Sequence, residues 1–195
     1  MNTTPEPGPA SMMRHLPNLI CVSRIALVWP IVAALKSGNF DLAMLIFAVA
    51  AVSDGLDGYL AKRFHWTSEL GKLLDPAADK LLLVSVFVSA TWLGMVPRWL
   101  TAAAVARDAM IALGALVFRV WFGPLRGRPT PLSKLNTAVQ LAYLLAVMSQ
   151  AAFRFPSAAM LAALAVVTLL TTIASGLDYM AAFTRRALAA PAGSL

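Results

Sequence analysis

Six long apolar runs dominate this sequence and constrain its fold more than any other feature. A helix that crosses a bilayer needs about 20 apolar residues, and each run approaches or exceeds that length. Only 13% of the residues are charged, about half the share in an ordinary soluble domain. The sequence therefore predicts an all-α integral membrane protein with six transmembrane helices, in a single domain over residues 1–195. The runs cover residues 19–35, 40–61, 72–95, 99–122, 133–153 and 157–183.

The start of the chain differs from the rest because residues 1–18 are polar and rich in proline. We expect a flexible stretch over residues 1–15, followed by a short juxtamembrane segment. The first apolar run has the length of a signal sequence, but Arg24 and Pro30 interrupt it. No clean cleavage site follows the run, so we interpret it as a retained span, with a cleaved signal as the alternative.

The basic residues of the connections predict the orientation of the spans. Six spans place both termini on one side, where nine cations fall against three on the other side. Since cytoplasmic loops carry the excess of Lys and Arg, we expect both termini in the cytoplasm and the protein in a bacterial inner membrane. This bias also explains the net charge of +7, so no nucleic-acid partner is expected. The nine cations are Arg14, Lys62, Arg63, Lys72, Arg126, Arg128, Lys134, Arg185 and Arg186, and the three are Lys36, Arg98 and Arg154.

Four of the nine acidic residues lie within 26 positions, at the end of the second run and the start of the third. Asp54 and Asp57 are one helical turn apart, and Asp75 and Asp79 are four residues apart, so each pair occupies one helix face. An acid inside a membrane costs about 2.5 kcal/mol or more, and four together repel one another. Carboxylate oxygens suit Mg²⁺ or Mn²⁺, and two such ions balance four charges. The pattern predicts a polar cavity at the cytoplasmic side that binds two divalent ions.

Small residues continue both acidic faces. Gly58 and Ala61 follow the first aspartate pair, and Gly71 precedes the second pair. Small side chains leave a groove in which a substrate carrying phosphates can reach the metal ions. Lys62 and Lys72 are placed to meet the negative charge of such a substrate.

The string DGLDGYLAK at 54–62, followed by GKLLDPAADK at 71–80, resembles the signature of the CDP-alcohol phosphatidyltransferase family of integral membrane enzymes. Lys62 stands where the family usually has arginine, and Arg63 lies next to it. Residues 16–30 are similar to the opening of phosphatidylglycerophosphate synthases and of eukaryotic-type cardiolipin synthases. The resemblance covers most of the chain.

The resemblance implies transfer of a phosphatidyl group from CDP-diacylglycerol to an alcohol, with release of CMP. It also implies that Asp79 is the general base, and the alternative is that Asp79 only binds metal. The two Mg²⁺ or Mn²⁺ ions would be bound by Asp54, Asp57, Asp75 and Asp79. The nucleotide would lie against Gly58, Ala61 and Gly71, with Lys62 at a phosphate.

Further basic and polar residues are binding candidates by the same resemblance. Asn18 and Arg24 would contact the substrate, although Arg24 can instead extend to the cytoplasmic surface. Arg107 and Lys134 would bind the phosphate of the acceptor. Two structural alternatives stay open: Arg107 forms only an ion pair, with Asp108 or with an aspartate of the motif, and Lys134 only adds to the cytoplasmic positive charge.

The acceptor alcohol is the least constrained prediction. Residues 105–119, 129–141 and 171–175 resemble cardiolipin synthases, which indicates phosphatidylglycerol as the acceptor. The runner-up is glycerol 3-phosphate, the acceptor of phosphatidylglycerophosphate synthases. A small ion-coupled transporter is a more remote alternative, because intramembrane carboxylates also bind ions in transit. Homodimers are common among relatives, so a homodimer is also an expectation.

Overall fold

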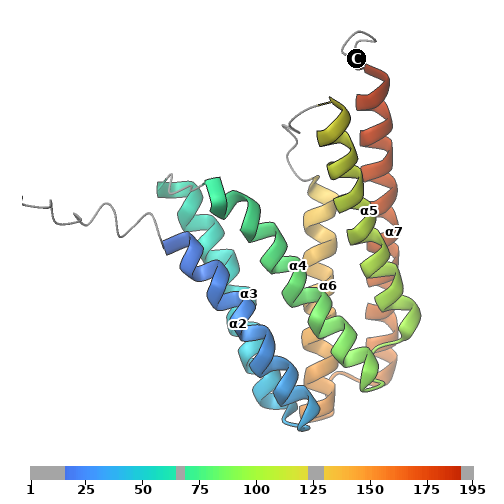
Figure 1. Ribbon diagram of the computed structural model, residues 1–195. Helices are drawn as coiled ribbons and strands as arrows, with labels where there is room; N and C mark the ends of the chain where they lie inside the picture. The colour runs from blue at the N-terminus through green and yellow to red at the C-terminus, as the bar shows by residue number, and fades with distance from the viewer. Residues whose placement is uncertain (1–15, 65–68, 123–129, 190–195) are drawn as a thin grey trace, which may run out of the picture. The chain divides into compact units, whose positions relative to one another are not determined.

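The computed structural model describes residues 16–64, 69–122 and 130–189, and within them the side chains of residues 23, 25–53, 80–117 and 130–185. All regular secondary structure in these ranges is helical, which confirms the all-α prediction (Figure 1). Each of the six apolar runs lies almost wholly within one helix. The helices are α2 (Leu16–Lys36), α3 (Phe40–Phe64), α4 (Glu69–Trp92), α5 (Arg98–Phe122), α6 (Pro131–Phe153) and α7 (Ala158–Ala189).

The chain divides into two compact units, residues 1–89 and 90–195. The first unit contains α2, α3 and most of α4, and in it α2 packs against α3. The second contains the last turn of α4 with α5, α6 and α7, and in it α7 packs against both α5 and α6. Helix α7 is therefore the central helix of the second unit.

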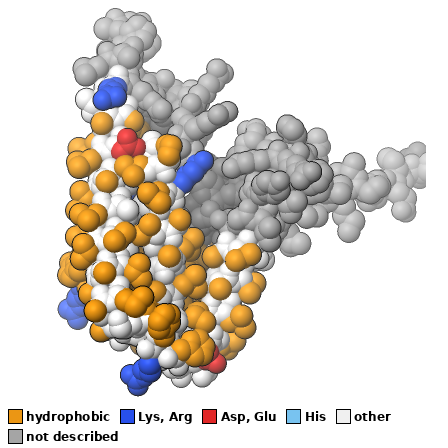
Figure 2. Space-filling view, turned by 180° about the vertical axis from the view of Figure 1, so that it is seen from behind, with side chains coloured by type: hydrophobic (Ala, Val, Ile, Leu, Met, Phe, Trp, Pro, Cys, Tyr) orange, Lys and Arg blue, Asp and Glu red, His pale blue; other side chains and the backbone are white. Residues whose placement is uncertain are grey.

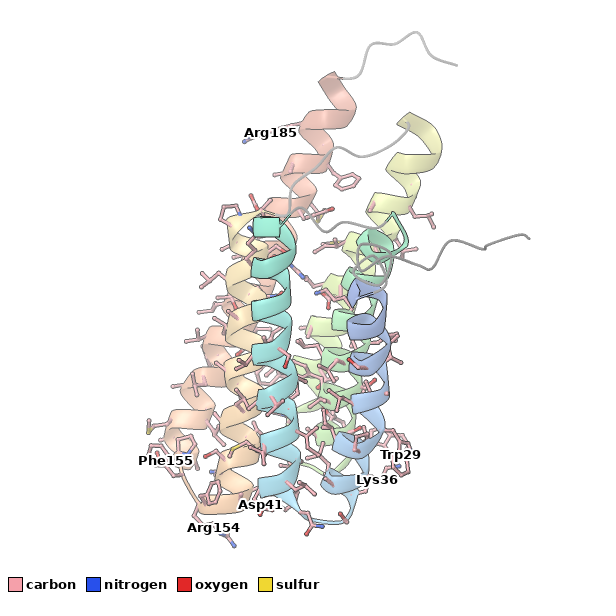
Figure 3. The ribbon with its side chains drawn as sticks, turned by 90° about the vertical axis from the view of Figure 1, so that its left-hand side faces the viewer. Trp29, Lys36, Asp41, Arg154, Phe155 and Arg185 are labelled. Carbon is pink, nitrogen blue, oxygen red and sulfur yellow. The ribbon has the colours of Figure 1, made fainter. Side chains whose placement is uncertain are left out.

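A tight turn at residues 37–39 joins α2 to α3, and Figure 3 shows Lys36 and Asp41 at this end of the pair. The backbone N–H of Asn39 donates to the carbonyl of Ala34 at 2.9 Å, which closes the end of α2. Gly38 has a φ of +78°, a conformation that residues with a Cβ rarely adopt. The turn thus depends on glycine at position 38.

Capping residues determine where α6 begins and ends. The Thr130 side chain accepts a hydrogen bond from the Ser133 amide at 3.2 Å, and Pro131 occupies the first turn, where no amide hydrogen is needed. The helix ends at Arg154, whose left-handed backbone (φ 59°, ψ 20°) lets its amide donate to the Gln150 carbonyl. Only four residues, 154–157, separate α6 from α7, so the two helices run antiparallel.

On the face that Figure 2 shows, hydrophobic side chains cover much of the described surface. Leu170 and Leu177 of α7 are 60% and 61% exposed, and Leu113 of α5 is 61% exposed. In water such a surface would be unstable, so these helices need an apolar surrounding phase. Among the described residues, two stretches are long and apolar enough to cross a membrane: Arg98–Val117 of α5 and Ala158–Arg185 of α7.

Candidate functional site

The structure places the aspartate motif on two helices, as its spacing predicts. Asp54 and Asp57 lie on α3, and Asp75 and Asp79 lie on α4. Their side chains lie outside the described residues, so the metal site stays a prediction. No group of three His, Cys, Asp or Glu able to bind a metal occurs among the residues that were described.

The predicted nucleotide contacts also lie on helices, at positions whose side chains are outside the described part. Asn18 and Arg24 belong to α2. Gly58, Ala61 and Lys62 belong to α3, and Gly71 belongs to the first turn of α4.

Arg107 of α5 is the one predicted site residue whose side chain is both described and buried, with 5% of its surface exposed. Its Nη1 donates to Oδ1 of Asp108 at 2.7 Å. Its Nη2 donates to the hydroxyl of Ser133 on α6 at 2.7 Å and to the hydroxyl of Ser175 on α7. Three helices therefore meet at one guanidinium group.

The ion pair with Asp108 makes this buried charge tolerable. The Arg107 and Asp108 side chains are 4% and 10% exposed, and the carboxylate supplies the opposite charge that a buried guanidinium needs. The predicted ion pair between Arg107 and Asp108 is therefore present, but it involves only Nη1 of the arginine. The Nε atom of Arg107 is buried and has no hydrogen-bond partner among the described residues.

Lys134 lies in the first turn of α6 and its side chain is exposed. Its backbone amide donates to the Thr130 carbonyl at 3.2 Å. The neighbouring residue, Ser133, reaches Arg107, so the two basic residues predicted to bind the acceptor occur at the same end of α6. Arg107 is buried and fixed, whereas Lys134 is free to reach an anion at the surface.

Helix α7 packs closely against α5 beside Arg107. A Cβ added at Gly176 would lie 3.8 Å from Cγ of Arg107 and 3.4 Å from Cε of Met110. These are ordinary van der Waals distances, so a methyl group fits at this position. The side chain of Arg107 is therefore within van der Waals reach of position 176.

A polar seam runs along the interface of α6 and α7. The Asn136 carboxamide oxygen accepts from the hydroxyls of Thr171 and Thr172 at 3.0 and 2.9 Å. The Gln140 amide nitrogen donates to the Thr172 hydroxyl at 3.4 Å. Nδ2 of Asn136 and Oε1 of Gln140 are buried without a hydrogen-bond partner in the described part of the chain. We define the polar seam as Ser133, Asn136 and Gln140 on α6 with Thr168, Thr172 and Ser175 on α7.

The sequence motifs do not predict this seam, although the spacing of its residues is a signal for it. The α6 members are spaced by three and then four residues, and the α7 members by four and then three. Both spacings produce one polar stripe on an otherwise apolar helix. The same spacing rule identifies the aspartates, but hydroxyl and amide side chains are common enough in membrane helices to pass unnoticed.

The sequence matches the CDP-alcohol phosphatidyltransferase family over residues 14–174. This range includes the aspartate motif, Arg107 and nearly the whole polar seam, and it ends one residue before Ser175. The chain therefore belongs to the CDP-alcohol phosphatidyltransferase family, which confirms the resemblance found in the motif.

Curated relatives of two kinds are similar to this chain. Human cardiolipin synthase (CMP-forming) is 32% identical over 180 residues, covering 84% of this chain and 60% of the human protein. Cardiolipin synthase (CMP-forming) of Streptomyces coelicolor is 39% identical over 110 residues, covering 53% of this chain and 51% of that protein. The probable phosphatidylglycerophosphate synthase of Mycobacterium tuberculosis is 30% identical over 197 residues, covering 93% and 88%. The chain thus spans less than two thirds of the two cardiolipin synthases.

Proposed function

We propose that this protein transfers a phosphatidyl group from CDP-diacylglycerol to phosphatidylglycerol, forming cardiolipin and releasing CMP. The observation that carries the proposal is the family match over residues 14–174, which includes the aspartate motif. Relatives named cardiolipin synthase (CMP-forming) support the choice of acceptor. Family membership favours this enzyme over an ion-coupled transporter.

The donor set of the motif fits divalent metal ions. Asp54 and Asp57 on α3, and Asp75 and Asp79 on α4, offer only carboxylate oxygens, at helical spacings that repeat along one face. These four residues would bind two Mg²⁺ or Mn²⁺ ions. When bound, the ions would neutralise the pyrophosphate and the negative charge of the departing CMP.

The proposed reaction is one displacement at phosphorus. The acceptor hydroxyl oxygen forms a bond to the phosphatidyl phosphorus, and the bond from that phosphorus to the bridging oxygen of CMP breaks. CMP leaves with the electron pair of the broken bond. Asp79 accepts the hydroxyl proton as general base. Gly58, Ala61 and Gly71 leave space for the nucleotide, while Asn18, Arg24 and Lys62 bind its phosphates or the lipid phosphate.

Arg107 and Lys134 bind the phosphate of the acceptor in this proposal. The support is the buried, charged guanidinium of Arg107, whose Nε lacks a partner in the described structure. A free N–H on a buried cation favours an anionic oxygen as its partner. Lys134, exposed near the same end of α6, adds a second positive charge.

Glycerol 3-phosphate is the second candidate acceptor, and one observation favours it. The chain covers 88% of the probable phosphatidylglycerophosphate synthase of Mycobacterium tuberculosis, compared with 60% of the human cardiolipin synthase. Both acceptors carry a phosphate and a primary hydroxyl, so the aspartate motif serves either one.

We further propose that all six helices span a bacterial inner membrane, with both termini and the metal site in the cytoplasm. The apolar surfaces of α5 and α7 support spanning. Arg154 and Arg185 lie at opposite ends of the second unit (Figure 3), and the basic tail after α7 supports a cytoplasmic C-terminus. The family match crosses both compact units, which supports one domain. A homodimer belongs to the same proposal, and the mass of the detergent-solubilised protein tests it.

One assay tests the proposed activity. Purified protein in detergent micelles receives CDP-diacylglycerol, Mg²⁺ or Mn²⁺, and either phosphatidylglycerol or glycerol 3-phosphate, and both CMP and the lipid product are measured. We expect CMP and cardiolipin with phosphatidylglycerol. Product with glycerol 3-phosphate alone would replace the first acceptor with the second, and no CMP with either acceptor would refute the enzyme proposal.

A further inference from the structure

We propose that Ser133 and Ser175 are positioning residues that hold the guanidinium of Arg107 so that its Nε–H remains available to an anionic phosphate oxygen of the acceptor. This inference rests on the proposed function, because it assigns Arg107 to acceptor binding. It adds two hydroxyl groups, from α6 and α7, whose role is to orient a binding residue on α5.

The hydrogen bonds of Arg107 define the orientation of its side chain. A guanidinium has five N–H groups. Nη2 directs both of its hydrogens to serine hydroxyls, and Nη1 directs one to Asp108. Because the group is planar, three bonds to three fixed acceptors leave it no freedom to rotate.

The two serines keep Asp108 from forming a two-bond pair with Arg107. Arginine and a carboxylate prefer a two-bond pair, and Asp108 is adjacent to Arg107 in the sequence. In the structure the pair uses Nη1 alone, since both hydrogens of Nη2 are directed to Ser133 and Ser175. Without the two hydroxyls, the guanidinium is free to turn and form a second bond to Asp108. If Nε donates that second bond, its N–H is no longer available to a ligand.

The polar seam fixes the two serines relative to each other. From Ser133, the α6 members follow at steps of three and four residues, and from Ser175 the α7 members return at the same steps. This pattern is the register of two antiparallel helices. The Asn136–Thr172 and Gln140–Thr172 hydrogen bonds hold that register one and two turns away from the serines. The position of the two hydroxyls is therefore a property of the α6–α7 pair as a whole.

The unpaired Nε is the second observation that points to a ligand. An unpartnered buried polar atom costs about 1–3 kcal/mol, and more for a charged group. Arg107 carries this cost on Nε, at a residue that is 5% exposed. An anionic oxygen that bonds Nε would remove the cost, and the serine hydroxyls beside Nη2 have hydrogens of their own to donate to it.

The test compares Ser133→Ala and Ser175→Ala with the wild-type protein in the CMP-release assay. Each change should raise the KM for the acceptor about tenfold, because it removes one hydrogen bond to a charged group. The KM for CDP-diacylglycerol should stay unchanged. Ser133→Thr retains the hydroxyl and should restore the acceptor KM. Ser149→Ala on α6 is the matched control, because Ser149 donates to the Phe155 carbonyl instead and should behave as wild type.

A combined variant separates positioning from general packing. If the serines act through Arg107, then adding Ser175→Ala to Arg107→Met should not raise the acceptor KM further. The proposal is overturned if the serine variants leave the acceptor KM unchanged, raise both KM values equally, or add to Arg107→Met in full.

Binding measurements make this outcome independent of turnover. Calorimetric titration with glycerol 3-phosphate, and separately with short-chain phosphatidylglycerol, gives the affinity for each source of the phosphate. Weaker binding of one of them by the Ser175→Ala variant supports positioning, and equal binding of both by variant and wild type overturns it. A wild type that binds but releases no CMP contradicts the proposed function alone.

Discussion

Asn136 on α6 accepts a hydrogen bond from the Thr172 hydroxyl on α7 at 2.9 Å, and neither residue is more than 2% exposed. The same carboxamide oxygen accepts from Thr171 at 3.0 Å. One amide therefore joins two helices at buried positions of their interface. Hydrogen bonds between membrane helices contribute about 0.6 kcal/mol on average and up to about 1.7 kcal/mol.

Asn136→Leu removes this acceptor at similar side-chain volume. We expect it to destabilise the protein by about 1–2 kcal/mol, since the buried Thr172 hydroxyl loses its acceptor. Unfolding of the detergent-solubilised protein by SDS measures the loss. Thr137→Val is the control, because the Thr137 hydroxyl donates only to the Ser133 carbonyl of its own helix in the described structure. Equal stability of the two variants would contradict a role for Asn136 in joining α6 and α7.

The apolar runs predict the helices well because burial in lipid and helix formation select the same residues. The run at 99–122 corresponds to α5, Arg98–Phe122. The differences occur where polar residues continue a helix: α4 begins at Glu69, three residues before the run at 72. At α6 the start is fixed by the Thr130 cap and Pro131, which hydropathy does not detect.

The site is predicted less completely than the fold. Arg107 is found from the sequence because a charge in an apolar run is conspicuous, and its possible pairing with Asp108 follows from adjacency. Ser133 and Ser175 are 42 positions apart, and only the packing of α7 against α5 and α6 brings them to one nitrogen. Contacts of this kind depend on helix register, which single-helix patterns do not specify.

Arg154 ends α6 in a left-handed conformation (φ 59°) that is unfavourable for a residue with a Cβ. Arg154→Gly should therefore stabilise the protein by about 1 kcal/mol, since glycine adopts this conformation without strain. Arg154→Ala controls for loss of the charge, because alanine keeps the strain. SDS unfolding compares the three proteins. A glycine variant no more stable than the alanine variant would show that this backbone strain is negligible.

Divalent ions should be essential if the four aspartates bind them. Treatment with EDTA is expected to stop CMP release, and excess Mg²⁺ or Mn²⁺ should restore it, because the carboxylates alone repel the pyrophosphate. Asp75→Asn should lower activity by at least about 100-fold at fixed metal concentration. Asp178→Asn is the matched control, since Asp178 lies on α7, away from the motif in the sequence, and should retain activity. Full activity after chelation would exclude the proposed metal site.

Asp79→Asn tests the general base separately from substrate binding. The amide cannot accept the hydroxyl proton, so turnover should fall by about 100-fold or more. Binding of CDP-diacylglycerol in the presence of metal should stay within a few-fold of wild type, measured by calorimetry. If binding and turnover fall together, Asp79 acts as a metal ligand alone.

Substitutions at Gly176 test whether acceptor binding depends on the position of the Arg107 side chain. A Cβ at this residue would make only ordinary contacts, 3.4 Å to Met110 and 3.8 Å to Arg107, so Gly176→Ala should leave the acceptor KM nearly unchanged. Gly176→Leu should displace the Arg107 side chain and raise that KM about tenfold or more, because a displaced arginine loses a charge-assisted hydrogen bond.

Gly114→Leu provides the comparison for Gly176→Leu. A Cβ at Gly114 would lie 3.5 Å from the Phe183 ring, so the leucine disturbs the same α5–α7 packing away from Arg107. Both leucine variants should lose stability by about 1–3 kcal/mol through overpacking. Only Gly176→Leu should change the ratio of the two KM values, since only it acts on the arginine. An equal change of the KM ratio in both variants would attribute the effect to helix packing and would contradict the proposal that Arg107 binds the acceptor.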